Sequence, residues 1–220
     1  MKFSALSDLK NSEPAVAAKA NYIKTHDQGI YNGKKGIPIV SGTRYLVQYR
    51  HPLESLTSFF EFQVRHGLLV DDRDVWNDFF ARRLEYWKKF VDKWILQFPR
   101  EEEFYSHPVS YQKLCASTDA TMREVIAFLT SVPTPVDEER LQRAVGQFST
   151  GWARYVDEEK KAGAPVVSEQ RDVRRFRYFD EKFVALEESL KVNFLDPLGI
   201  ETILEPEGRV TDSSAEAVAK

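Results

Sequence analysis

The sequence predicts an α/β protein in which a small parallel sheet is flanked by helices and the C-terminal half is rich in helix. Short apolar, β-prone segments alternate with long amphipathic helices, a pattern typical of parallel β-α-β units. The chain has 220 residues, of which 42% are hydrophobic, enough for one domain with a buried core. Roughly three or four strands are visible, which is few for a doubly wound sheet.

The first half is predicted to hold the best strand and the two longest helices. Pro52 suits the first residue of a helix because proline has no N–H to lose there, and Asp74 can cap the helix that Pro99 ends. In chain order, the expected elements are a helix over Phe3–Ala20 interrupted near Pro14, a β-prone segment over Asn21–Lys24, a polar loop with Gly29, Gly33 and Gly36, a buried strand over Tyr45–Tyr49, and helices over Leu53–His66 and Val75–Phe98.

The second half is predicted to be mostly helical. We expect residues 1–204 to form a single domain and residues 205–220 to be a polar, disordered tail. In chain order, the expected elements are a short strand and turn over His107–Leu114, a helix over Thr121–Leu129, a helix over Asp137–Phe148 capped by Asp137 or Thr134, a loop over Gly163–Ser168, a basic segment over Arg171–Tyr178 and a helix over Asp180–Leu195.

The composition and the spacing of particular residues argue against several classes of function. The formal net charge of -3 gives the chain no overall attraction to nucleic acid, and no apolar run reaches the roughly 18 residues of a membrane span. The start lacks a signal-peptide core, so a cytoplasmic location is expected. The one cysteine, Cys115, is interpreted as a small buried apolar residue. The four histidines are scattered, without the spacing of metal ligands.

The segment Tyr45–Phe62 carries the best candidate for chemistry. A strand ends in Arg50, Pro52 starts a helix, and Ser58 lies in the second turn of that helix. An arginine at the carboxyl end of a parallel strand points into the crevice where α/β proteins bind ligands, and its guanidinium can grip a phosphate. A serine near the helix start can add a hydrogen bond. The alternative is an arginine paired with Glu54 and a serine bonded back to the main chain.

This segment resembles a motif of the sulfotransferases that use 3′-phosphoadenosine 5′-phosphosulfate (PAPS). In that family a strand runs into R-x-P-x-(D/E)-x-x-x-S, and aromatic residues usually follow. The chain has, in that order, Arg50, Pro52, Glu54, Ser58, Phe59 and Phe60. The resemblance implies a sulfotransferase fold similar to that of P-loop NTPases, in which Arg50 and Ser58 bind the 3′-phosphate of the donor.

The upstream segment Tyr22–His26 (YIKTH) resembles the family's K-T-H element. The resemblance implies that His26 is the base that takes the acceptor proton and that Lys24 stabilises the oxygens on the leaving side of the donor. The residue types suit these roles, because histidine titrates near neutral pH and a lysine can meet charge that develops on the departing phosphate. The alternative is a surface histidine at the end of a strand.

Two further segments resemble family elements. Val109–Leu114 (VSYQKL) resembles Y-E-(D/E)-(L/M), which implies that Tyr111 lies near the adenine base and that Gln112 replaces an acid; the alternative is a half-buried core tyrosine. Arg171–Arg177 (RDVRRFR) lies where the family has a basic R-K-G-x-x-G-x-W loop. Arg174 and Arg175 would then close over the 3′-phosphate, although the glycines and the tryptophan are missing. The alternative is a solvated basic stretch.

The family's opening element, a strand followed by a P-(K/R)-S-G-T-T loop around the 5′-phosphosulfate, has no counterpart before Tyr22. We therefore expect the fold to be incomplete at its N-terminus. Ser41-Gly42-Thr43 has similar letters but precedes a strand, so it is interpreted as a turn. Three explanations stay open: a fragment or mis-started reading frame, a degenerate family member that binds something else, or a partner chain that supplies the strand and loop.

Two functions follow from these observations. The resemblance implies sulfuryl transfer from PAPS, without a metal, to a hydroxyl or amine of a small-molecule or carbohydrate acceptor. The alternative is a non-catalytic sulfotransferase-like protein that binds a ligand or oligomerises, with its aromatic helices forming a homo-oligomer interface.

Overall fold

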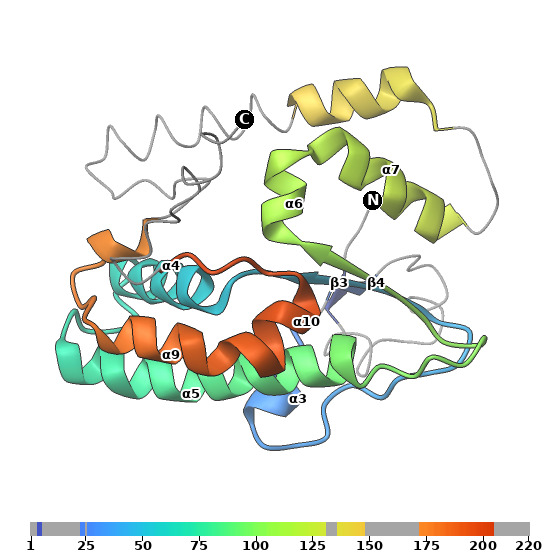
Figure 1. Ribbon diagram of the computed structural model, residues 1–220. Coiled ribbons are helices and arrows are strands. Elements are labelled where there is room, and N and C mark those ends of the chain that lie inside the picture. Colours follow the sequence, from blue (N-terminus) through green and yellow to red (C-terminus); the bar gives the residue numbers. More distant parts are fainter. Residues whose placement is uncertain (1–3, 6–22, 25, 131–135, 148–171, 205–220) are drawn as a thin grey trace, which may run out of the picture.

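The computed structural model describes residues 4–5, 23–24, 26–130, 136–147 and 172–204. It confirms the α/β class: the described residues hold four strands in two separate parallel pairs, and most of the rest is helical. β1 (Ser4–Ala5) pairs with β2 (Ile23–Lys24), and β3 (Arg44–Tyr49) pairs with β4 (Tyr105–Ser110) (Figure 1).

β3 and β4 form the larger pair. Their register sets Arg44 opposite Tyr105 and Tyr49 opposite Ser110, so the carboxyl ends of the two strands lie side by side. The chain passes from β3 to β4 through α4 (Pro52–Arg65), α5 (Arg73–Val91) and the π-helical turn η1 (Asp92–Leu96). A parallel pair needs such a long crossover, because a tight turn cannot return the chain to the same end of the sheet.

The N-terminal pair corrects one prediction. Ser4–Ala5 forms strand β1 and not the start of a helix over Phe3–Ala20. β1 pairs in parallel with β2, which lies within the predicted β-prone segment. A strand therefore precedes the K-T-H segment, where the sequence was expected to lack one. The two strands are joined by residues 6–22, which lie outside the described residues.

The two long helices begin at identifiable caps. α4 starts at Pro52, as predicted. α5 is capped by Asp72 and not by Asp74, because the Asp72 carboxylate accepts hydrogen bonds from the main-chain amides of Asp74 and Val75 at 2.8 and 3.2 Å. α5 also ends earlier than predicted, since the α-helical pattern stops at Val91 and gives way to η1.

The second half is helical, as predicted, with changed boundaries. The turn that was predicted at the end of the segment His107–Leu114 is a helix, α6. The predicted helix over Asp180–Leu195 starts at Lys182 and becomes π-helical after Leu190. The predicted loop over Gly163–Ser168 and the tail 205–220 lie outside the described residues. The elements are α6 (Tyr111–Ala116), α7 (Thr118–Thr130), a helix over 138–147, the 3-10 turn η2 (Val173–Arg175), α9 (Lys182–Leu190), the π-helical turn η3 (Lys191–Leu195) and α10 (Asp196–Leu198).

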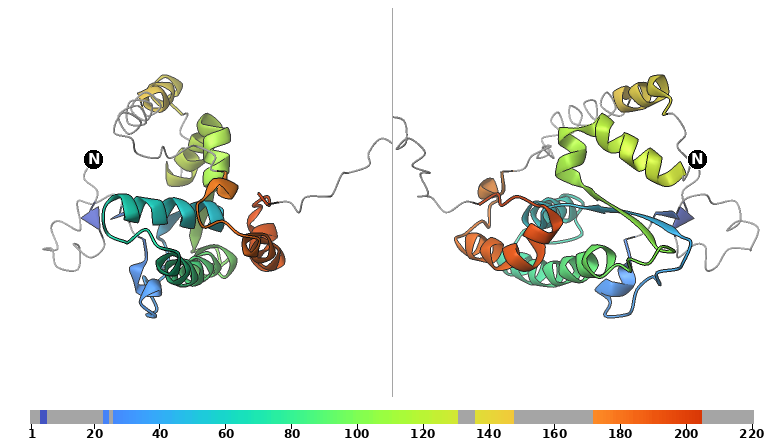
Figure 2. Two further views of the ribbon diagram at one scale, coloured as in Figure 1. Left: turned by 90° about the vertical axis from the view of Figure 1, so that its left-hand side faces the viewer. Right: turned by 45° about the vertical axis from the view of Figure 1, so that its right-hand side comes forward.

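The helices lie on both sides of the β3–β4 pair. α6, α7 and the helix 138–147 lie on one side, and α5 and α9 lie on the other (Figures 1 and 2). The main core forms where α4, α5 and the C-terminal elements meet. Its largest buried side chains include Phe60, Trp76, Phe79, Trp87, Phe176 and Phe183. This packing fixes α4 against α5 and therefore fixes the end of β3 that leads into α4.

Cys115 lies on α6 and is exposed, so its prediction as a buried apolar residue is wrong. α6 is a short helix with no buried residue, and the apolar neighbours that a buried cysteine would need are not provided there. Among the helices that the structure describes, none is long and apolar enough to cross a membrane.

Candidate site at the carboxyl ends of β3 and β4

Arg50 is the first residue after β3, and three contacts fix it. Its carbonyl oxygen accepts a hydrogen bond from Trp87 Nε1 at 3.1 Å. Its Nε donates to Glu54 Oε2 at 3.2 Å, one turn into α4. Its guanidinium carbon lies 4.5 Å from the centre of the Tyr111 ring. Arg50 and Tyr111, which the sequence analysis assigned to one ligand, are therefore neighbours.

The parallel register explains why Arg50 and Tyr111 meet. Tyr49 and Ser110 are the last paired residues of the two strands, so the residues that follow them lie next to each other. Ser110 then caps α6, with its hydroxyl accepting from the Lys113 amide at 3.5 Å, and Tyr111 becomes the first residue of that helix. Ligands of open α/β sheets bind at this edge of the sheet.

Glu54 links the two sides of the site. The same oxygen, Oε2, accepts from Arg50 Nε and from Gln112 Nε2, the latter at 3.0 Å. Ser110 Oγ donates to Gln112 Oε1 at 3.1 Å, which orients the amide. Gln112, which stands where the resemblance expects an acid, thus serves as a donor to Glu54. The pairing of Arg50 with Glu54 was the alternative interpretation of the motif, and it is present.

One donor of Arg50 is left over by these contacts. The Arg50 side chain is 15% exposed and that of Glu54 is 7% exposed, so the pair is largely removed from water. Within the described residues, Arg50 Nη2 is buried and makes no hydrogen bond. A buried donor without an acceptor costs about 1–3 kcal/mol. An oxyanion bound at Nη2 would remove that cost, which is the chemistry that a phosphate-binding arginine needs.

Ser58 lies on α4, one turn beyond Glu54 and two turns beyond Arg50. It is partly buried, and no hydrogen bond joins it to Arg50 in the described part of the chain. The neighbouring hydroxyl of Thr57 makes the bond back to the main chain that was considered for Ser58, donating to Leu53 O at 2.7 Å. Ser58 is thus on the same face of α4 as Glu54, with Glu54 between it and Arg50.

His26 and Lys24 belong to the other strand pair. Lys24 is the last residue of β2, and His26 follows two residues later with its side chain exposed. The main-chain carbonyl of His26 accepts a hydrogen bond from the Tyr86 hydroxyl of α5. The exposed histidine at a strand end agrees with the alternative interpretation, and it also leaves the imidazole accessible to a ligand.

Asp27 was missed by the sequence analysis. It is 1% exposed and has a positive φ of 46°, a left-handed conformation that few non-glycine residues adopt. Its carboxylate accepts from the Ile37 amide at 2.7 Å, from Lys93 Nζ at 2.8 Å and from Trp94 Nε1 at 2.9 Å. Asp27 therefore anchors the segment after His26 to η1.

Arg174 and Arg175 lie on η2, which packs against α4. The packing runs through apolar side chains: Val173 is buried, and the rings of Phe176 and Phe60 are 6.2 Å apart. Both arginines are exposed, and Arg175 Nε pairs with Asp172 Oδ2 at 3.2 Å. None of the described contacts brings either arginine to Arg50, so the structure does not assemble this part of the predicted site.

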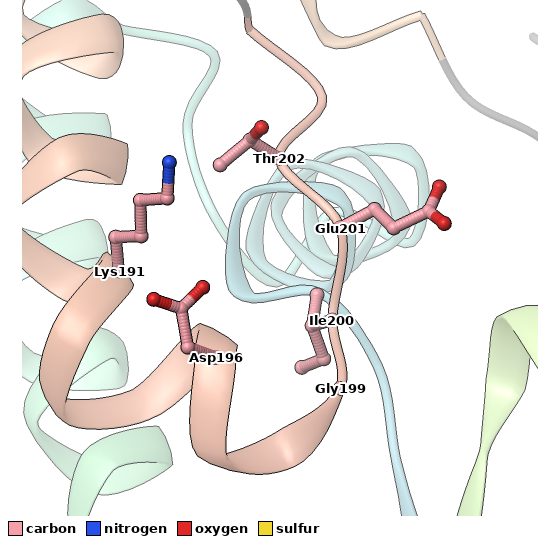
Figure 3. Close-up of a pocket in the computed structure, with 6 residues that line it drawn as sticks. All are labelled: Lys191, Asp196, Gly199, Ile200, Glu201 and Thr202. Atoms are coloured by element: carbon pink, nitrogen blue, oxygen red, sulfur yellow. The ribbon is translucent and has the colours of Figure 1, made fainter.

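A hollow in the described part of the chain lies elsewhere. It has a volume of about 480 Å³, and Lys191, Asp196 and Thr202 point toward one another across it (Figure 3). Its remaining lining residues are Gly199, Ile200 and Glu201. None of its lining residues belongs to the described part of the predicted site. In the described part of the chain, no group of three or more His, Cys, Asp or Glu side chains is arranged to hold a metal.

A buried pair of ionisable side chains, His51 and Glu187, lies next to the site. His51 follows Arg50, and its Nε2 lies 2.9 Å from Glu187 Oε1, with both side chains at most 1% exposed. The N–H of the ring is poorly aligned with that oxygen. Glu187 also accepts from the amides of Ile203 and Leu204, both at 2.8 Å. Burial raises the pKa of Glu187, but these donors outweigh it and the net pKa is lowered.

Comparison with protein-family models, with curated proteins and with solved structures finds no match for this chain. The motif resemblance to sulfotransferases therefore stays a prediction.

Proposed function

We propose that Arg50 and Tyr111 bind the adenosine 3′-phosphate part of PAPS, and that the chain is a sulfotransferase-like protein that transfers a sulfuryl group to a hydroxyl or amine. The observation that carries this proposal is the buried Nη2 of Arg50, from which none of the described residues accepts a hydrogen bond, beside an aromatic ring at the carboxyl ends of two parallel strands. A guanidinium supplies charge-assisted hydrogen bonds to phosphate, and an aromatic face stacks on a base.

Glu54 has a defined part in this site. By accepting from Nε, it orients the guanidinium, and Nη2 keeps its hydrogen-bonding capacity unused by the described residues. Its negative charge also opposes a bound phosphate. How tightly an anion is held depends on how many donors surround it, and Ser58 lies one turn beyond Glu54 on the same face of α4.

The transfer itself assigns roles to His26 and Lys24. As the acceptor oxygen or nitrogen forms a bond to sulfur, the bond between sulfur and the bridging oxygen of the donor 5′-phosphate breaks. The acceptor proton passes to the imidazole of His26, and the released phosphate oxygen keeps the electron pair. Lys24 offsets that developing charge. No metal or covalent intermediate is required, because positioning and electrostatics supply the rate.

The second candidate function is ligand binding or oligomerisation without turnover. It is favoured by the hydrogen bonds of Arg50 and Gln112 to Glu54, which hold the arginine without a ligand. A protein that binds nucleotide without turnover would use the same Arg50 site as the enzyme, and it would differ in that His26 does not act on an acceptor.

Calorimetry with 3′-phosphoadenosine 5′-phosphate tests the shared site. We expect micromolar binding to the full chain and a loss of about a hundredfold in Arg50→Ala, since charged hydrogen bonds contribute about 1.5–3 kcal/mol each. Arg82→Ala is the matched control, because Arg82 pairs with Asp78 on the exposed face of α5. No binding up to millimolar nucleotide, or equal binding by Arg50→Ala, contradicts the proposal. Binding without [³⁵S]sulfuryl transfer to any acceptor favours the second candidate.

A further inference from the structure

Two consecutive residues of α5 hold the main chain at both parts of the candidate site. The Tyr86 hydroxyl donates to the carbonyl oxygen of His26, and Trp87 Nε1 donates to the carbonyl oxygen of Arg50 at 3.1 Å. His26 follows β2 and Arg50 follows β3, and these strands belong to different sheets. Besides shared packing, α5 therefore provides a direct hydrogen-bonded link between the two segments.

Tyr86 is suited to hold a main-chain carbonyl permanently. Burial, with a smaller contribution from Asp27 and an opposing one from Arg83, raises the pKa of Tyr86 to about 12. The phenol thus keeps its proton and stays a donor throughout the neutral range. Its ring is fixed by an edge contact with Tyr31 at 5.9 Å and by Phe90 at 6.0 Å. The donor has little freedom to leave the His26 carbonyl.

The residue after His26 is fixed as well. Asp27 is buried, and its carboxylate is held by Lys93 and Trp94 of η1. Trp94 in turn packs against Tyr45 of β3 at 5.0 Å between ring centres. The main chain of His26 is therefore held at its own carbonyl by α5 and one residue later by η1, while its imidazole stays exposed.

We infer that Tyr86 is a positioning residue for His26: its hydrogen bond fixes the main chain from which the imidazole projects, and thereby the place of the imidazole relative to Arg50. The inference rests on the proposed function, in which His26 takes the acceptor proton while Arg50 holds the donor. A base must lie within hydrogen-bond reach of the proton that it takes. A misplacement of about 1 Å can cost roughly a hundredfold in rate.

Tyr86→Phe removes the hydroxyl and keeps the ring, so it tests the hydrogen bond alone. We expect kcat for sulfuryl transfer to fall by about ten- to a hundredfold, with the Kd for 3′-phosphoadenosine 5′-phosphate changed less than about twofold. In ¹H–¹³C spectra of the four histidines, the His26 signal should shift and broaden. His26→Gln assigns that signal by its disappearance.

Tyr178→Phe is the matched control. The Tyr178 hydroxyl also donates a hydrogen bond, to Asp71 Oδ1 at 2.8 Å, and neither residue contacts His26, Asp27 or Arg50 in the described contacts. We expect its kcat, nucleotide affinity and His26 signal to equal those of the wild type. A purely structural role for Tyr86 predicts that Tyr86→Phe lowers the melting temperature while kcat and the His26 signal stay unchanged, and this result would overturn the inference.

Failure of the proposed function can be told apart from failure of this inference. If the wild-type chain binds no nucleotide, the proposed function fails, and the His26 signal in Tyr86→Phe still decides whether Tyr86 fixes the histidine. If the wild type binds nucleotide through Arg50 and transfers sulfuryl, but Tyr86→Phe leaves both kcat and the signal unchanged, only the positioning role is lost.

Discussion

The guanidinium of Arg50 stacks on the ring of Tyr111, with 4.5 Å between the guanidinium carbon and the ring centre. At the opposite end of the same strand pair, Arg44 lies 5.0 Å from the ring of Tyr105. The two contacts use the same residue types across the same two strands. Of these two pairs, only Arg50–Tyr111 has a buried donor that no described residue accepts from. This pair lies at the carboxyl ends of the strands, where parallel sheets bind ligands.

Because the two Arg–Tyr contacts are alike, the Arg44–Tyr105 contact can serve as the control for a test of Tyr111. Tyr111→Ala should weaken binding of 3′-phosphoadenosine 5′-phosphate by roughly 5- to 150-fold, because base stacking on an aromatic ring contributes about 1–3 kcal/mol. Tyr111→Phe should retain the affinity, since the ring supplies the contact. Tyr105→Ala breaks the equivalent contact at the other end and should leave the calorimetric Kd unchanged. Equal losses in Tyr105→Ala and Tyr111→Ala would mean that both act only through the sheet.

Glu54→Gln should change stability and affinity in opposite directions. The substitution removes the charge partner of Arg50, so we expect the free energy of unfolding in urea to fall by about 1–3 kcal/mol. It also removes a negative charge beside the anion site. That change should tighten nucleotide binding by roughly fivefold, or about 1 kcal/mol.

Glu85→Gln is the control for this substitution, because Glu85 is exposed and pairs with Lys89 on the outer face of α5. It should change neither quantity measurably, as surface pairs contribute little. If Glu54→Gln weakens nucleotide binding, Glu54 orients Arg50 for the ligand more than it repels the anion, and the assigned balance is wrong.

The parts of the site that lie near one another in sequence were predictable. An apolar run into Arg50 and a proline at the helix start indicate a strand that leads into α4, and both elements are present. Once β3 and β4 are parallel, Arg50 and Tyr111 must lie at the same edge. The contact of Arg50 with Glu54 is also local, because Arg50 lies two residues before α4 and Glu54 lies in the first turn of that helix.

The parts that depend on distant contacts were not predictable. Asp27 looks like an ordinary polar loop residue, and the partners that explain its burial, Lys93 and Trp94, lie 66 and 67 residues away. The hydroxyl of Tyr86 reaches His26 over 60 residues. Local signals were also ambiguous, since Asp72 and Asp74 both suit a helix cap and only the structure shows that Asp72 is used.

Glu187 should make the stability of the fold depend on pH. Its donors hold its pKa in the folded chain below the ordinary value of 4.5, so the folded state binds the proton less readily than the unfolded state. The stabilisation is therefore fully present above the unfolded pKa, and it is lost as the pH falls from about 4.5 through the folded pKa. Between pH 5 and 7, this contribution should be constant.

Urea unfolding of Glu187→Gln between pH 3 and 7 measures that contribution. We expect a loss of about 3 kcal/mol at pH 7, because the buried pair with His51 is broken, and the difference from wild type should shrink below pH 4.5. Glu188→Gln, at an exposed neighbouring position, should follow the wild type at every pH. A difference between Glu187→Gln and wild type that stays constant down to pH 3 would show that the carboxylate charge contributes nothing.

Alanine substitutions at Gly33 and Gly36, in the loop after His26, distinguish the cost of backbone strain from the cost of a clash with Asp27. Gly33 and Gly36 have nearly equal φ angles of 70° and 71°, so alanine is strained equally at both, by about 1–2 kcal/mol. A Cβ at Gly33 meets nothing within 4 Å, whereas a Cβ at Gly36 would lie 2.3 Å from Asp27 Oδ1. Gly36→Ala must displace the Asp27 carboxylate and should cost a further 2–3 kcal/mol or so.

Asp27→Gly tests whether that extra cost belongs to Asp27. Glycine adopts the positive φ of this position without strain and removes the carboxylate that the new Cβ would meet. In the Asp27→Gly background, Gly36→Ala should therefore cost no more than Gly33→Ala does, in chemical unfolding followed by tryptophan fluorescence. The cost of Gly36→Ala could instead stay the same in both backgrounds. The packing of this loop would then be set by the close approach of Gly36 to Gly29, because a Cβ built on Gly29 would lie 2.6 Å from the Cα of Gly36. In that case Asp27 is held by the loop and does not organise it.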